Sequence, residues 1–176
     1  MKRNWLFLLV LTSISLALLL HCGDEKEEDN PTGPGNTSGG VLTAKVSGSV
    51  NLTFSASVAK GSMDDNFVSI TGYQKSGSKT YTLTITLFQP PSAVNGSHDI
   101  VDTVNALDDK KALAVMAVDE NNQVLNAFTS YSGSITFTES SPKLKGTFQF
   151  TGREGAAGSP EVTVTQGQFN VDQTAP

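Results

Sequence analysis

The residues best suited to acid–base chemistry are His98 and its neighbour Asp99, in the segment Gly96-Ser97-His98-Asp99. A His beside an Asp could belong to a Ser-His-Asp triad, in which the imidazole takes the proton of a serine hydroxyl. A triad needs three groups that converge in space, and the many serines of this chain include none in a nucleophile-elbow motif. We therefore interpret His98 as a surface residue at a turn before a strand, and predict no catalysis. A hydrolase that uses His98 with a nearby serine remains an alternative.

Acidic residues occur in pairs near expected turns and could supply oxygen ligands for Ca²⁺. The pairs are Asp64/Asp65, Asp99/Asp102, Asp108/Asp109 and Asp119/Glu120. None has the spacing of a calcium loop such as D-x-[DN]-x-[DN]-G, and acids at turns are ordinary in β proteins. One His and one Cys outside the first 21 residues do not make a usual zinc site. With no glycine-rich phosphate loop either, the sequence predicts no metal and no cofactor.

The single cysteine, Cys22, directly follows an apolar run. Lys2 and Arg3 precede this run, and it is shorter than the roughly 20 apolar residues of a membrane-spanning helix, so residues 1–21 read as a signal peptide. The run ends in Leu19-Leu20-His21-Cys22-Gly23, which resembles the bacterial lipobox, although His21 stands where a small residue is usual. We predict that Cys22 is lipidated and becomes the first mature residue. The competing interpretation is a buried free thiol, which would be a liability in an oxidising compartment.

Residues 22–40 read as a lipidated cysteine followed by a disordered tether. Residues 24–40, DEKEEDNPTGPGNTSGG, hold no apolar side chain able to join a core, and such a segment cannot offset its chain entropy. The acids after Cys22 look like the acidic export signal of surface lipoproteins of the Bacteroidota. They also fit a solvated linker that stays off an anionic membrane.

The charge of the chain excludes one class of partner. The formal net charge is −5, and Lys2 and Arg3 lie in the leader, so the remainder is more acidic still. No basic patch marks a nucleic-acid site. Trp5 is the only tryptophan and lies in the leader. Abundant Gly, Ser and Thr favour strands and turns over helices.

Residues 41–176 are expected to form a single β domain, because apolar and polar side chains alternate with period two. Residues 80–87, for example, place Tyr81, Leu83, Ile85 and Leu87 on one face and threonines on the other. A continuously apolar run at 113–118 is compatible with a central strand covered on both faces. The other predicted strands are 42–46, 51–58, 67–73, 123–129, 133–138, 146–151 and 161–165, the last reaching Phe169 and Val171 after a break at Gln166-Gly167.

One-sided alternation predicts an all-β protein, an antiparallel β-sandwich of roughly nine to ten strands. The alternative is a lipocalin-like or partly open β-barrel. An enclosed apolar cavity of about 300 Å³ or more would favour a barrel that carries a ligand. Tyr73, Tyr81 and Tyr131 could line such a site, but Tyr81 fits the inward face of its strand.

The C-terminal third carries a recognisable pattern. Gly146-Thr147-Phe148-Gln149-Phe150 and Gly167-Gln168-Phe169 follow Gly133-Ser134-Ile135-Thr136-Phe137. This resembles the end of an uncharacterised family of Bacteroidota lipoproteins, a domain of unknown function with a G-T-F-x-F … G-x-F close. The resemblance implies an exported, all-β, lipid-anchored protein, and carries no activity over to any residue.

Together these observations predict a cell-envelope protein of unknown specific role, a binding or accessory structural module without catalysis. Its partner is the outer membrane, reached through the lipid, and its body faces the periplasm or the cell surface. A protein, glycan or small-molecule ligand is left open. The alternative function is a lipocalin-like small-molecule carrier.

Overall fold

A computed structural model describes residues 40–88, 94–106 and 111–174, all within one unit, Asn36–Pro176. The predicted signal peptide, Cys22, the tether up to residue 39 and Asp108/Asp109 lie outside the described residues. Those described form an all-β structure, as the alternation predicts, and no helix among them could cross a membrane. The strands are β1 (Val41–Gly48), β2 (Leu52–Ser55), β3 (Val58–Met63), β4 (Phe67–Ser76), β5 (Lys79–Phe88), β6 (Gly96–Val101), β7 (Ala112–Glu120), β8 (Gln123–Glu139), β9 (Lys143–Arg153) and β10 (Glu161–Thr174).

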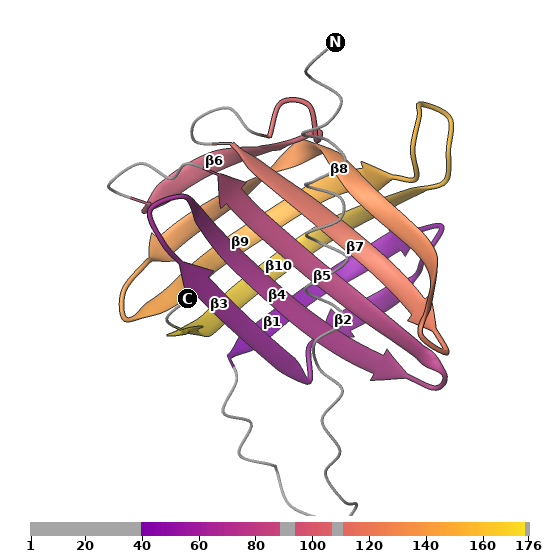
Figure 1. The fold of residues 1–176 in the computed structure, drawn as a ribbon, viewed down its shortest axis with the longest axis horizontal. Coiled ribbons are helices and arrows are strands. Elements are labelled where there is room, and N and C mark those ends of the chain that lie inside the picture. The colour runs from indigo at the N-terminus through magenta and orange to yellow at the C-terminus, as the bar shows by residue number, and fades with distance from the viewer. Residues whose placement is uncertain (1–39, 89–93, 107–110, 175–176) are drawn as a thin grey trace, which may run out of the picture. The chain divides into compact units, whose positions relative to one another are not determined.

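The strands form one 10-stranded, mostly antiparallel sheet in the order β2-β1-β10-β3-β4-β5-β7-β6-β8-β9. Additional pairings join β10 to β9 and β7 to β8, so the sheet runs round in a ring. The join between β10 and β3 is short and parallel, from Gln173 and Thr174 to Gly61 and Ser62. Strands β3, β4, β5 and β7 cross in front of β1, β9 and β10 (Figure 1). This arrangement fits both a β-sandwich and an open barrel.

Apolar side chains fill the inner face of the sheet. On β5, Leu83, Ile85 and Leu87 are buried and Tyr81 packs partly buried against them, as predicted. A Cβ atom on Gly61 of β3 would lie 2.8 Å from side-chain atoms of Leu144 and Val171. Because β3 pairs with β10 at this point, the absence of a side chain on Gly61 lets the apolar side chains of Leu144 and Val171 pack over β3 on the inner face.

On β7 the inner residues Ala112, Ala114, Met116 and Val118 are buried. Leu113, Val115 and Ala117 on the other face remain partly exposed. The strand is therefore central in the sheet but covered on one face only.

The strand predicted at 51–58 is instead divided between β2 and β3. Leu52, Phe54 and Ala56 share the inner side, but Val58 is exposed and 42% accessible. The chain changes partners at this point, because Ala56 N donates to Leu42 O and Ser57 N donates to Tyr73 O. Alternation alone cannot reveal such a change of partner.

The free edge of β2 is covered by a side chain from β4. Ser55 N donates to Gln74 Oε1 at 2.8 Å, and Gln74 Nε2 donates to Thr53 O at 3.4 Å. Unpaired edge groups invite pairing with other chains, so the Gln74 carboxamide closes the edge that β2 would otherwise present.

The strands predicted at 123–129 and 133–138 are one strand, β8, which changes partner along its length. Its first part pairs with β7 and its second part with β6. Buried Ser130 stands at the change, where its Oγ accepts from Ala114 N at 3.0 Å and donates to Val101 O at 2.7 Å. One hydroxyl thus satisfies backbone groups of β7 and of the residue that ends β6.

Candidate functional site

His98 is not a surface residue, contrary to the prediction. It lies in β6 with its side chain on the inner face beside Ile100, and is only 7% exposed. Its Nε2 is 2.7 Å from Val94 O, and its ring meets Phe137 edge-on at 5.9 Å between centroids. Asp99 is exposed on the opposite face. Within the described residues, the hydrogen-bond partner of His98 is therefore a backbone carbonyl and not a serine hydroxyl.

The acidic residues in the described turns hold the chain in place. Asp64 Oδ1 accepts from Asn66 N and Phe67 N at 2.6 and 2.9 Å. Asp102 Oδ1 accepts from Val104 N and Asn105 N at 3.1 and 3.0 Å. These are Asx turns. Over residues 40–88, 94–106 and 111–174, no three His, Cys, Asp or Glu side chains gather into a group that could hold a metal.

The three tyrosines do not share a site. Tyr81 packs against the core, Tyr73 is 37% exposed on β4, and Tyr131 lies on β8 with the guanidinium carbon of Arg153 4.6 Å from its ring centroid. A cation–π contact of this kind occupies one face of the Tyr131 ring.

A shallow hollow lies on the outer face of β8, β9 and β10. Its volume is about 470 Å³, and it is open to solvent. The lining consists mainly of hydroxyl and carboxamide side chains, and Phe148 and Gly167 lie between them. The Phe148 side chain itself points into the core and is only 4% exposed. The polar residues are Ser134 and Thr136 of β8, Thr147 and Gln149 of β9, and Gln166 and Gln168 of β10. We call these six residues the groove set.

A β-bulge in β10 shapes this hollow. The register with β9 shifts between Val164 and Gly167, and Gln166 has a φ of 53°. A side chain other than Gly or Asn is strained at such a φ. A Cβ on Gly167 would lie 2.5 Å from Phe148 O and 2.6 Å from its ring carbon Cδ2. The bare glycine therefore lets the Phe148 ring lie against the bulge.

A second, smaller hollow of about 240 Å³ continues from the first. The two share Thr147 and Gln168, and the second extends to Asn170, Lys145 and the start of β1 at Val41. We call the two hollows together the outer groove. It runs across paired strands, because Thr136, Thr147 and Gln168 are direct neighbours across β8, β9 and β10.

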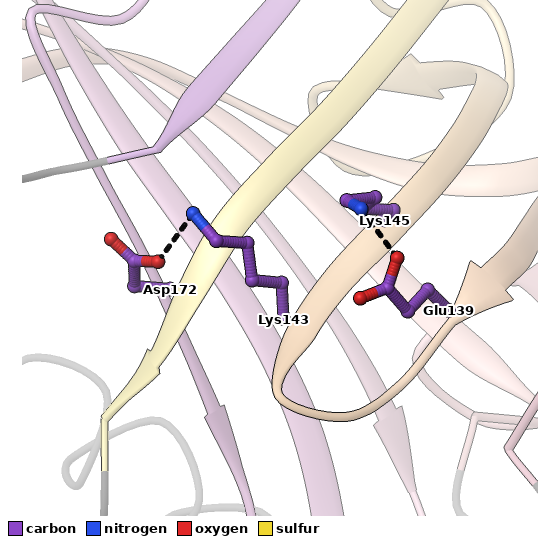
Figure 2. A network of polar contacts seen from close by, with 4 residues as sticks. All are labelled: Glu139, Lys143, Lys145 and Asp172. Atoms are coloured by element: carbon purple, nitrogen blue, oxygen red, sulfur yellow. Dashed lines mark hydrogen bonds and ion pairs between the residues drawn. The ribbon is translucent and has the colours of Figure 1, made fainter.

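Two ion pairs flank the end of the outer groove near the turn between β8 and β9 (Figure 2). Lys143 Nζ lies 2.7 Å from Asp172 Oδ1, and Lys145 pairs with Glu139. The members of each pair face one another across neighbouring strands. The cation that reaches the outer groove, Lys145, is therefore matched by a carboxylate, and the six polar residues of the first hollow carry no charge.

The groove set has hydrogen-bonding capacity that the protein does not use. Within the described part of the chain, none of its six side chains makes a hydrogen bond. A carboxamide offers two donors and an acceptor, and a hydroxyl offers one donor and two lone pairs. No group in the set titrates near neutral pH. The arrangement can therefore hold an uncharged polar ligand, and it lacks the general acid or base that hydrolysis would need in this hollow.

Sequence reasoning did not identify the groove set. Its members are polar residues on the outer face of strands, which normally face only water. One signal was present, the break in alternation at Gln166-Gly167, because an interrupted strand often marks a bulge.

Comparison with known proteins found no matching family model, no matching curated protein and no matching solved structure.

Proposed function

We propose that this chain is an exported lipoprotein, anchored to the outer membrane through Cys22, whose β domain is a binding module without catalysis. The anchor is supported by the leader, the lipobox-like ending and the acidic tether in the sequence. The tether gives the domain reach from the membrane, with the domain on the periplasmic side or at the cell surface.

The observation that carries the binding role is the outer groove, where six uncharged polar side chains that make no hydrogen bond to any described residue line a hollow. Because the groove lies on the outer face of the sheet, a large ligand can reach it. His98, the residue on which the hydrolase hypothesis depends, is taken up by core packing and by the Val94 carbonyl. These features favour ligand binding at the protein surface over hydrolysis in a cleft.

The anchor is tested by replacing the thiol. We expect Cys22→Ser to move the protein out of the outer-membrane fraction and to abolish incorporation of a labelled fatty acid. His21→Ala serves as the control, because it places a small residue before the cysteine. This variant should still incorporate the labelled fatty acid. Membrane retention of Cys22→Ser without label would show that another feature holds the protein there.

The second candidate function is a lipocalin-like carrier, favoured by the ring of strands. A carrier needs an enclosed apolar space, and a side chain added at Gly61 would enter the interior beside Leu144 and Val171. Titration with a fluorescent fatty acid distinguishes the two functions. Saturable binding that Gly61→Val abolishes would favour the carrier, since the added side chain would fill the interior.

A further inference from the structure

We propose that the outer groove binds an uncharged glycan chain, a ligand rich in hydroxyl groups that lies across β8, β9 and β10. This inference rests on the proposed binding role and names its ligand class. The first hollow, about 470 Å³, falls within the range of small-molecule sites, and the second, about 240 Å³, continues it. A chain of several sugar units fits two connected hollows better than a single compact ligand does.

The lining selects for hydroxyl groups. Each sugar hydroxyl both donates and accepts a hydrogen bond, as do the carboxamides of Gln149, Gln166 and Gln168. The first hollow carries no charge, and Lys145 is paired with Glu139, so the outer groove offers no net attraction for a phosphate or a carboxylate.

The conformation of Gln166 is the second, independent observation. Its φ of 53° is one that glycine adopts with least strain, yet the position holds a long carboxamide side chain. Backbone strain of this kind tends to occur at binding sites, where the surrounding structure supports it. The strained residue here is a member of the groove set, and its side chain lines the hollow beside Gln168.

A peptide is the less suitable occupant. Extended peptides usually bind by adding a strand to an open sheet edge, where main-chain groups are free. The outer groove instead lies over β8, β9 and β10, whose backbones pair with one another through the floor of the groove. At the edge strand β2, the Gln74 carboxamide already occupies the main-chain groups of Thr53 and Ser55.

The test uses the full chain, purified in detergent from the fraction that holds it, and calorimetric titration with uncharged linear hexasaccharides of glucose, mannose and xylose. We expect saturable binding to at least one of them. Gln166→Gly and Gln168→Ala should each weaken it about tenfold, because each removes a carboxamide that makes one or two hydrogen bonds. Gln166→Gly also relieves backbone strain, so loss of folding would not explain its effect.

Gln123→Ala is the matched control, an exposed glutamine of β8 outside the outer groove, and it should leave the affinity unchanged. Binding that survives both groove substitutions would overturn the assignment of the site. Absence of binding to every hexasaccharide, or groove-dependent binding of an uncharged peptide alone, would overturn the glycan class. These outcomes are separate from the lipid anchor, which the Cys22→Ser fractionation tests by itself.

Discussion

Two outer faces of the same sheet are built from the same kinds of polar side chain, and they differ in what those side chains bind. On β4 and β5, Thr71 and Thr84 hydrogen-bond to each other at 3.2 Å, and Ser69 and Thr86 at 3.3 Å. On β8 and β9, Thr136 and Thr147 are also direct cross-strand partners, but neither hydroxyl has a hydrogen bond within the described residues.

The difference shows that a polar strand face is not by itself a binding site. Where hydroxyls on neighbouring strands hydrogen-bond to one another, few donors and acceptors on that face remain for a ligand. Where they do not bond to one another, as at Thr136 and Thr147, the same groups are open to a ligand. The Gln166-Gly167 bulge of β10 borders this second face, and its residues line the hollow there.

The largest effect is expected at the glycine of the bulge. In Gly167→Ala the new Cβ would lie 2.5 Å from Phe148 O. We expect a loss of about 1–3 kcal/mol in the free energy of unfolding, as for other overpacked sites. Urea denaturation measures it. The control is Gly152→Ala in β9, whose nearest atom, Thr129 O, would be 3.2 Å away, and an equal loss in the control would contradict this account of the bulge.

The neighbouring residue should respond in the opposite direction. Gln166→Gly is expected to raise the free energy of unfolding by about 0.5–1 kcal/mol. Glycine relieves the strain at positive φ, which stabilises the folded state. Part of this gain is offset because glycine also has a greater conformational entropy in the unfolded chain. The same denaturation assay checks it. A destabilised variant would mean that the Gln166 side chain stabilises the fold, and its strain would then have a structural explanation.

A smaller effect separates the two threonine pairs. A double-mutant cycle with Thr71→Val and Thr84→Val should give a coupling energy of about 0.5 kcal/mol, within the range for cross-strand pairs. The matched cycle with Thr136→Val and Thr147→Val should give a smaller coupling, because those hydroxyls are not hydrogen-bonded to each other. Equal coupling in the two cycles would remove the distinction between the faces.

The smallest expected effect concerns pH. Burial raises the pKa of Asp119, at the end of β7, above its ordinary value. The contribution of Asp119 to the free energy of unfolding is therefore fully present below the pKa that Asp119 has in the unfolded chain. It is lost as the pH rises through the pKa of Asp119 in the folded protein. Asp119→Asn should flatten this part of the stability profile in pH-dependent urea denaturation. Affinity in the outer groove should not change over the same window, because no residue of the groove set titrates there.

The sequence predicted the regular part of this fold well. Alternation located the inward residues Leu83, Ile85 and Leu87. A turn was expected near Asp119/Glu120, and the two residues that follow, Asn121 and Asn122, have the positive φ of a hairpin turn. Alternation did not reveal changes of partner, because the end of β2 and the middle of β8 are set by distant strands. The two-residue alternation also could not show that His98 points inward, because β6 is short and follows a loop.

The outer groove could not be predicted, for a related reason. Gln149, Gln166 and Gln168 are ordinary outer-face residues in the sequence. Their common feature is the place where β8, β9 and β10 meet, which only the pairing of the strands shows. The break at Gln166-Gly167 indicated an interruption but not which side chains would gather around it.

The most direct test of the central claim is an amide chemical-shift titration of the full chain in detergent micelles with the best-binding hexasaccharide. The account predicts shifts concentrated at Thr147, Gln149 and the bulge residues Gln166, Gly167 and Gln168, with Thr71 and Thr84 unmoved. Shifts centred on Thr71 and Thr84, or spread evenly over both faces, would contradict it.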